Sequence, residues 1–401
     1  MTSLRFLLRL VCLAVLAAFA VVSSANEQAI FADGAEHAPL PGGSNYLWFG
    51  DDGACKADSR DAFGLVKRYH ETLAGQGAVR AIAQQQLATM HERGMRRLSL
   101  GIYFMHQPAD GGTLVDSADP AQVAQAVANI AALLADVRAA GYREVLFRFF
   151  PTDNINPSQP VFPDYGSADY AARVDEYWSL IRQVRPVLVA SRLAYRIDLG
   201  VELAARDANP VWIPESDRYK YPANETWSRT VRTLWQRYVA EYGNGGDTVG
   251  FSFFVDDDQN RARSRVRHMR YLYEGVYPPV FALDIYAGET YDEGAKFRMM
   301  DGFMVSQNPT GAKWDAANWI LSEAYYEDPL AAESIAEAMT ETGRRVLYLT
   351  QWPLDRAGSC QMPHVNVAPP FRWQVYPAAG LSVLNIALPP LQARCGLRCG
   401  L

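Results

Sequence analysis

The sequence lacks an excess of basic residues. It contains 38 Lys and Arg against 44 Asp and Glu, which gives a formal net charge of −6. The first 25 residues include Arg5 and Arg9 and no acidic residue, so their removal would change the net charge to −8. Nucleic acids and anionic membrane surfaces are bound through basic patches. The composition therefore argues against both as the main partner.

The chain also has few cysteines and no recurring segment. Of five Cys, Cys12 lies near the N-terminus, and the spacing of the others does not match a zinc site because no His lies near the terminal pair. Four Cys remain if the N-terminal segment with Cys12 is removed, and an even number in an exported chain indicates two disulfides, with three pairings open. No internal repeat or low-complexity linker divides the chain, so we expect one domain. The four remaining cysteines are Cys55, Cys360, Cys395 and Cys399.

The N-terminus has the pattern of a targeting segment. Two basic residues precede an apolar run from Leu10 to Val22, and Ser23-Ser24-Ala25 supplies small residues for cleavage. The run is shorter than the roughly 20 residues of a membrane span. We therefore predict a signal peptide over residues 1–25 and a secreted or periplasmic protein, with no stable membrane insertion after cleavage. An uncleaved anchor is the alternative.

After a polar leader over residues 26–43, strand and helix patterns alternate. Apolar segments indicate eight strands centred near residues 47, 99, 147, 199, 252, 283, 320 and 348. This alternation predicts a parallel sheet, and eight strands close a barrel. The first strand is followed by WFGDDGAC and not by the G-x-G-x-x-G of a doubly wound sheet. We predict a single-domain α/β fold, a (β/α)8 TIM barrel over residues 44–362, with a C-terminal appendage over residues 363–401.

Three local assignments complete this prediction. Helical periodicity predicts one helix over roughly residues 61–93, and the fourth strand is predicted over residues 195–204. The segment 303–307 is ambiguous, with a short extra strand as one interpretation.

Acidic residues occur where two predicted strands end, which is where barrels place functional groups. Strand alternation places Asp198, Gly200 and Glu202 on one face of the fourth strand, and Glu323 ends the seventh. Two carboxylates across a barrel mouth suit glycoside hydrolysis, in which one acid protonates the leaving oxygen and the other attacks the anomeric carbon. Capping of loops or helix N-termini is the competing interpretation. We predict Glu202 and Glu323 as the catalytic pair.

Other polar and aromatic residues are predicted to surround this pair. Alternation turns Arg148 toward the barrel interior, where an unpartnered charge is costly. An ion network of Arg148 with Asp198 or Asp284 is therefore the alternative role for these residues. We expect no organic cofactor and no catalytic metal. The predicted substrate-binding residues are Trp48, Tyr103, Arg148, Asp256, Asp284, Tyr286 and Trp352.

The arrangement resembles the retaining glycoside hydrolases of the (β/α)8 clan that includes many cellulases and mannanases. The resemblance assigns the acid/base to Glu202 in GVELA and the nucleophile to Glu323 in ILSEAYY. It also implies that Tyr286 lies beside the nucleophile, that Trp352 forms a sugar platform, and that a poly- or oligosaccharide is the substrate. The chain departs from the family at Val201, where the clan usually has an Asn that binds the sugar 2-hydroxyl.

Two alternatives stay open. IDLGVE with LDIY is similar to chitinase-type barrels, which use D-x-D-x-E on strand four, although Gly200 replaces the middle Asp. In that substrate-assisted scheme Glu202 is still the acid, and Asp284 and Tyr286 support the N-acetyl group of the substrate. The other alternative, which Val201 favours, is a non-catalytic polysaccharide-binding barrel involved in exopolysaccharide handling.

Overall fold

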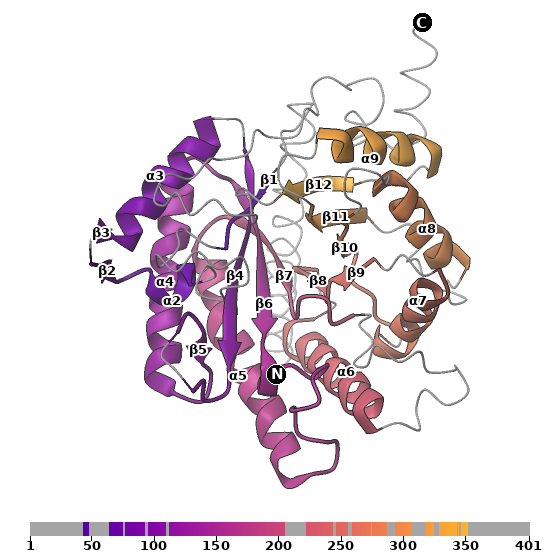
Figure 1. Cartoon of the computed structure of the whole chain (residues 1–401), viewed down its shortest axis with the longest axis horizontal. Coiled ribbons are helices and arrows are strands. Elements are labelled where there is room, and N and C mark those ends of the chain that lie inside the picture. The colour runs from indigo at the N-terminus through magenta and orange to yellow at the C-terminus, as the bar shows by residue number, and fades with distance from the viewer. Residues whose placement is uncertain are drawn as a thin grey trace, which may run out of the picture.

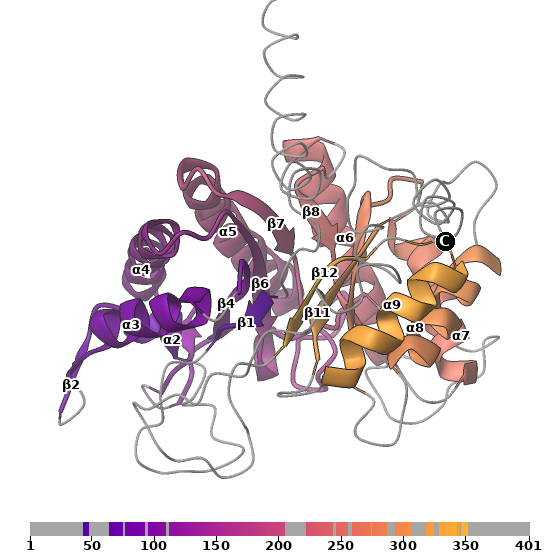
Figure 2. The same ribbon diagram turned by 90° about the horizontal axis from the view of Figure 1, so that it is seen from above.

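A computed structural model gives the fold of the chain (Figures 1 and 2). The predicted signal peptide, the C-terminal appendage and all five cysteines lie outside the residues that it describes. The described residues are 43–47, 64–74, 77–92, 95–109, 112–204, 222–243, 246–255, 259–273, 275–286, 293–306, 318–324, 329–342, 344 and 346–351.

Parallel strands form a closed barrel within these described ranges. The hydrogen-bonded order is β8-β7-β6-β4-β1-β12-β11-β10-β9, and every neighbouring pair is parallel. The fifth strand consists of two halves, because β8 (Thr248–Gly250) pairs with β7 and β9 (Phe253–Phe254) pairs with β10. The ring closes through this divided strand, which confirms the predicted (β/α)8 TIM barrel. The other barrel strands are β1 (Gly43–Asn45), β4 (Arg97–Met105), β6 (Glu144–Pro151), β7 (Ala194–Asp198), β10 (Val280–Asp284), β11 (Asn318–Glu323) and β12 (Val346–Gln351), and β5 (Val115–Asp116) pairs with β4.

Helices alternate with the strands and cover the outside of the barrel. Figure 1 shows α3, α4 and α5 on one side of the strands and α7, α8 and α9 on the other, and Figure 2 shows the same division from above. The main hydrophobic core lies between strands and helices, while a smaller cluster that includes Leu146, Ala282 and Ile320 fills the barrel interior. The helices are α3 (Val79–Glu92), α4 (Pro120–Ala139), α5 (Ala168–Ala190), α6 (Pro222–Tyr242), α7 (Gln259–Tyr273), α8 (Glu293–Ser306) and α9 (Pro329–Thr342).

Helix α4 shows how local sequence sets an element and how packing holds it. The Asp119 carboxylate accepts a hydrogen bond from the backbone N–H of Ala121 at 2.8 Å, and Pro120 occupies the first turn. By length and composition α4 is the one helix among the described residues that could span a membrane. Its apolar positions, such as Ile130 and Leu133, are instead buried in the core, as in the interior helix of a globular protein.

The structure corrects the three local assignments. The predicted helix over 61–93 is divided into α2 (Leu65–Arg68), a hairpin of β2 (Thr72–Leu73) and β3 (Gly77–Ala78), and α3. Gly77 has φ of +97°, so the turn interrupts the helix although the apolar spacing continues across it. The segment 303–306 is the end of α8, with Met304 buried, and the fourth strand ends at Asp198 instead of Ala204.

Gly250 ends the first half of the divided strand, and we expect it to tolerate no side chain. Its φ is +69°, and an added Cβ would collide with the hydroxyl of buried Tyr273. Gly250→Ala should therefore lower the free energy of unfolding by roughly 2–4 kcal/mol, from backbone strain and overpacking together.

Gly302 is the matched control, since it lies in α8 and its added Cβ would meet nothing within 4 Å. Gly302→Ala should raise the free energy of unfolding by about 0.5–1 kcal/mol. Urea denaturation of both variants makes the comparison. Equal effects of the two substitutions would contradict the strain assigned to Gly250.

Candidate active site

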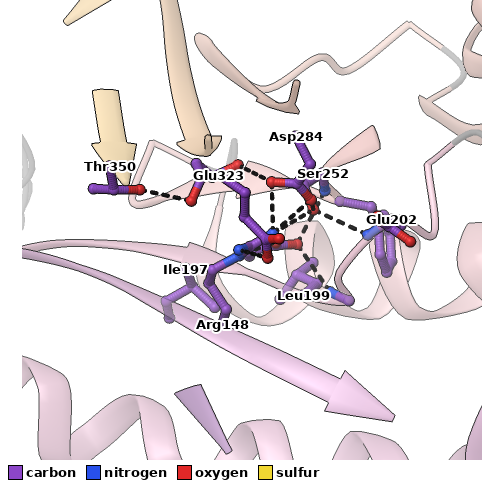
Figure 3. A network of polar contacts seen from close by, with 12 residues as sticks. Arg148, Ile197, Leu199, Glu202, Ser252, Asp284, Glu323 and Thr350 are labelled. Atoms are coloured by element: carbon purple, nitrogen blue, oxygen red, sulfur yellow. Dashed lines mark hydrogen bonds and ion pairs between the residues drawn. The ribbon is translucent and has the colours of Figure 1, made fainter. Parts of the chain in front are cut away.

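One buried arginine joins four strands of the barrel. Arg148 on β6 is fully buried, and its Nε donates to Asp198 Oδ2 on β7 at 3.1 Å. Its Nη2 donates to the two carboxylate oxygens of Asp284 on β10 at 2.9 and 2.7 Å, and its Nη1 donates to Glu323 Oε1 on β11. Figure 3 shows these contacts converging on the guanidinium. The ion network given above as the alternative to substrate binding for Arg148 and Asp284 is therefore present, and it includes Glu323 as well.

A bulge in β11 brings Glu323 into this network. Leu283 is paired with Leu321, but the next residue, Asp284, is paired with Glu323, so Ser322 is an extra residue in the strand. Strict alternation would place Glu323 on the same face as Leu321, which packs in the outer core. The extra residue turns Glu323 inward, and bulges of this kind commonly aim side chains at functional sites.

Both carboxylate oxygens of Glu323 have donors. Oε1 accepts from Arg148, and Oε2 accepts from the hydroxyl of Tyr286, so Tyr286 lies beside Glu323 as the sequence predicts. The backbone N–H of Ile285 donates to the Glu323 carbonyl at 3.1 Å, and Lys296 Nζ donates to the Tyr286 carbonyl at 2.6 Å. The carboxylate is 8% exposed as a side chain. Its orientation is thus fixed from both sides.

Glu202 is positioned by the chain that follows β7. Its backbone N–H donates to Ser252 Oγ at 3.0 Å, and the preceding N–H of Val201 donates to the Phe149 carbonyl at 2.9 Å. Glu202 has φ of +55°, a left-handed conformation that costs a residue with Cβ about 1–2 kcal/mol. Such strain persists where surrounding contacts enforce it and is concentrated at functional sites. Because β7 ends at Asp198, this turn and not strand alternation sets the direction of Glu202.

Helix α6 supports the same turn from outside. Trp227 Nε1 donates to the Leu203 carbonyl at 3.0 Å, and the indole stacks on His268 of α7 with ring centroids 4.4 Å apart. The turn that carries Glu202 is therefore tied to two helices of the outer layer.

Ser252 links the two halves of the site. It lies in the break between β8 and β9, where its Oγ accepts from Glu202 N and from Arg148 Nη2 at 3.2 Å. The same hydroxyl donates to Asp284 Oδ2 at 3.3 Å. In Figure 3, Glu323 and Glu202 lie on either side of Asp284 and Ser252. The break between β8 and β9 thus positions Ser252, which connects the Glu202 turn to the buried network.

Both predicted catalytic acids act electrostatically on the buried carboxyl of Asp284. Burial raises the pKa of Asp284 well above its ordinary value, and the negative charges of Glu323 and Glu202 add to this rise against the effect of Arg148. Burial alone would lower the pKa of Arg148, but Asp284, Glu323 and Asp198 together raise it above its ordinary value. Arg148 therefore stays charged. The charges of Glu202 and Glu323 both reach Asp284, although the two residues are 121 positions apart in the chain.

The remaining predicted residues are only partly described. Tyr103 on β4 is half-buried and stacks on Phe150 with centroids 4.2 Å apart. Trp48, Asp256 and Trp352 lie outside the described residues. Within the described ranges, no group of three His, Cys, Asp or Glu side chains could hold a metal ion.

Sequence analysis missed the two serines of the network, Ser252 and Ser322. Each is a small polar residue inside an apolar strand segment, GFSFF and WILSE, and each is fully buried. That isolation was a usable signal, since a buried hydroxyl requires a hydrogen-bond partner.

Solved structures that match this chain include glycoside hydrolases. A family 5 enzyme from Prevotella bryantii in complex with a xyloglucan tetradecasaccharide is 9% identical, with 86% of this chain and 96% of that chain covered and a TM-score of 0.46. A fungal β-1,4-galactanase is 12% identical, with 75% and 90% covered and a TM-score of 0.45. A Bacillus family 26 endo-β-1,4-mannanase is 12% identical, with 90% and 88% covered and a TM-score of 0.40.

No family model and no curated protein matches the sequence. At these identities and TM-scores the structural similarity gives no information on activity or substrate, and the barrel itself is established by the strand pairing of this chain.

Removal of the Arg148 charge should destabilise the fold strongly. Arg148→Met would leave three buried carboxyl groups without their cation, which we expect to cost roughly 3–5 kcal/mol of unfolding free energy. Arg182 is the control, because its ion pair with Glu241 is exposed and should be worth less than about 1 kcal/mol. Denaturant titration of Arg148→Met and Arg182→Met measures both values. A small loss at Arg148 would show that the network is not a structural requirement.

The left-handed backbone at Glu202 predicts an unusual order of stabilities. Glu202→Gly should be about 0.5–1 kcal/mol more stable than Glu202→Ala, since Gly relieves strain worth about 1–2 kcal/mol and loses about 0.5–1 kcal/mol to chain entropy. At the exposed Glu337 inside helix α9 the order should reverse, with Gly about 1 kcal/mol less stable than Ala. Thermal or urea unfolding of the four variants tests this, and the same order at both sites would contradict it.

Proposed function

We propose that the protein is an exported glycoside hydrolase that cleaves a poly- or oligosaccharide with retention of anomeric configuration. The observation that carries this proposal is the environment of Glu323. A carboxylate at the end of the seventh barrel strand is held by Arg148 and Tyr286 while Glu202 lies close enough for its charge to reach the same buried network. Export rests on the signal pattern of residues 1–25.

Glu323 acts as the nucleophile in this proposal. Arg148 donates to one oxygen of its carboxylate, and the hydroxyl of Tyr286 donates to the second oxygen. The carboxylate attacks the anomeric carbon as the bond to the leaving oxygen breaks, which gives a glycosyl ester on Glu323. Water then hydrolyses this ester and restores the carboxylate.

Glu202 acts as the general acid and then as the general base. In the first step it gives its proton to the leaving oxygen, and in the second it removes a proton from the attacking water. The hydrogen bond from its backbone to Ser252 and the strained turn hold it at the carboxyl end of the barrel. Tyr103, Trp48, Asp256 and Trp352 remain the proposed substrate-binding residues.

Arg148 and Asp284 receive a different role from the one predicted. Both side chains are fully buried and bond to each other, so they support Glu323 from beneath and do not meet the sugar directly. This arrangement also disfavours the chitinase-like alternative, which requires Asp284 and Tyr286 to face an N-acetyl group. Tyr286 instead donates to Glu323.

A non-catalytic polysaccharide-binding barrel is the second candidate. Val201 favours it, because an apolar side chain cannot bind a sugar 2-hydroxyl as an Asn would. The two candidates differ in turnover. Sugar binding without hydrolysis by the wild-type protein would support the binding barrel.

Removal of the nucleophile should abolish hydrolysis. On a panel of polysaccharides and aryl glycosides, Glu323→Gln should lose at least about 10³-fold in kcat because the amide cannot form the glycosyl ester. Glu241→Gln, a change at an exposed ion pair, should retain full activity. NMR of the first product should show the anomer of the substrate. Inversion, or equal activity of Glu323→Gln, would refute the assignment.

Substitution of Glu202 should depend on the leaving group. Glu202→Gln should lose about 10²–10⁴-fold in kcat/KM on a glycan or an alkyl glycoside, which needs protonation by an acid. The phenolate of an aryl glycoside with an acidic phenol leaves without protonation, so cleavage of that glycosidic bond should be impaired much less. Comparison of the two substrates measures the effect. Equal losses on both would argue that Glu202 is not the acid.

A further inference from the structure

We propose that Asp284 is protonated at neutral pH and donates its proton from Oδ1 to Ser322 Oγ. This makes Asp284 a positioning residue, because its neutral form leaves the charge of Arg148 to Glu323 and Asp198. The positioning role rests on the proposed function, whereas the protonation itself does not.

The charges around Arg148 give the first argument. One guanidinium contacts three carboxylates, those of Asp198, Asp284 and Glu323, whose side chains are 0%, 0% and 8% exposed. Within the described residues, all the ion pairs of these three acids are made with Arg148. Two uncompensated negative charges would be buried there if all three were ionised. Such a cluster relieves the cost of burial by taking up a proton.

The position of Asp284 makes it the carboxyl that takes up this proton. The charged groups that face it are Arg148 from β6, Glu323 from β11 and Glu202 from the turn after β7, and Asp198 of β7 binds the Nε of the same guanidinium. Two of them are acids that act directly on Asp284, and both raise its pKa in addition to burial. Asp198 has compensation of another kind, because its Oδ1 accepts from the backbone N–H groups of Ser252 and Gly200 at 3.0 and 3.2 Å.

Hydrogen counting at Ser322 supplies an independent argument. Ser322 Oγ lies 2.7 Å from Asp284 Oδ1 and 3.1 Å from the Leu283 carbonyl oxygen. The Leu283 carbonyl and an ionised Asp284 carry no hydrogen for these contacts, and the Ser322 hydroxyl has only one. With an ionised Asp284, one of the two contacts would therefore contain no hydrogen. With the proton on Asp284 Oδ1, the carboxyl donates to Ser322 and Ser322 donates to Leu283. Each contact then contains one hydrogen.

The other partners of Asp284 are compatible with the neutral form. Arg148 Nη2 and Ser252 Oγ donate to its oxygens, and a protonated carboxyl still accepts such bonds. The consequence is electrostatic. With Asp284 neutral, the one positive charge of Arg148 stands between the two carboxylates of Asp198 and Glu323.

Infrared spectroscopy tests this without any substrate. The wild-type protein at neutral pH should show a carbonyl stretch of a protonated carboxylic acid that persists in Glu202→Gln, which removes the proton of the proposed general acid, and that is lost in Asp284→Asn. Asp198→Asn, the matched amide substitution, should keep it. Because the pKa of Asp284 is raised in the folded chain, the band should be present at low and neutral pH and be lost as the pH rises through that value.

A second pair of variants keeps the test decisive if Asp284→Asn does not fold. Ser322→Ala removes the acceptor and should shift the frequency of the band, whereas Ser306→Ala, an exposed serine of α8, should leave it unchanged. Absence of the band in the wild type, its loss on Asp198→Asn, or its insensitivity to Ser322 would overturn the proposal. A protein with the band and without turnover would refute the proposed function alone.

Discussion

The contacts of Arg148 are the constraint on which the rest of the structure depends. A guanidinium with no exposure cannot remain charged unless acids surround it, and acids at the same depth cannot remain ionised without it. The side chain therefore fixes the relative positions of β6, β7, β10 and β11. The barrel interior is apolar around Leu146 and becomes polar two residues further along β6, at Arg148, because this side chain gathers the acids around it.

Two departures from regular strand geometry build the site on this base. The bulge at Ser322 turns Glu323 inward, and the break in the fifth strand presents Ser252 to Glu202 and Arg148. Regular strands would place these groups on other faces. The strain at Glu202, with φ of +55°, is a third departure and lies in the same place. At each of these points regular geometry is replaced by a polar contact to the network, and this is the pattern expected of a functional site.

The sequence predicted the barrel well because strand and helix periods alternate clearly over its length. It also placed Arg148 inside, since alternation within a regular strand such as β6 fixes the side-chain face. It failed where a turn interrupts a periodic pattern, as at Gly77, because apolar spacing continues across the hairpin. The direction of Glu202 and the inward turn of Glu323 could not be predicted, since an extra residue or a left-handed turn leaves no mark in the hydrophobic pattern.

Covalent trapping of a glycosyl ester is the most direct test of Glu323 as the nucleophile. A 2-deoxy-2-fluoro glycoside with a good leaving group slows hydrolysis of the glycosyl ester more than its formation, so the intermediate accumulates on a retaining enzyme. Mass spectrometry of the intact protein and of its peptides should show one added sugar, located on Glu323 within the β11 segment. No labelling by a glycoside that the wild-type protein hydrolyses, or a label on another residue, would contradict the assignment of Glu323 and the role of the Arg148 network.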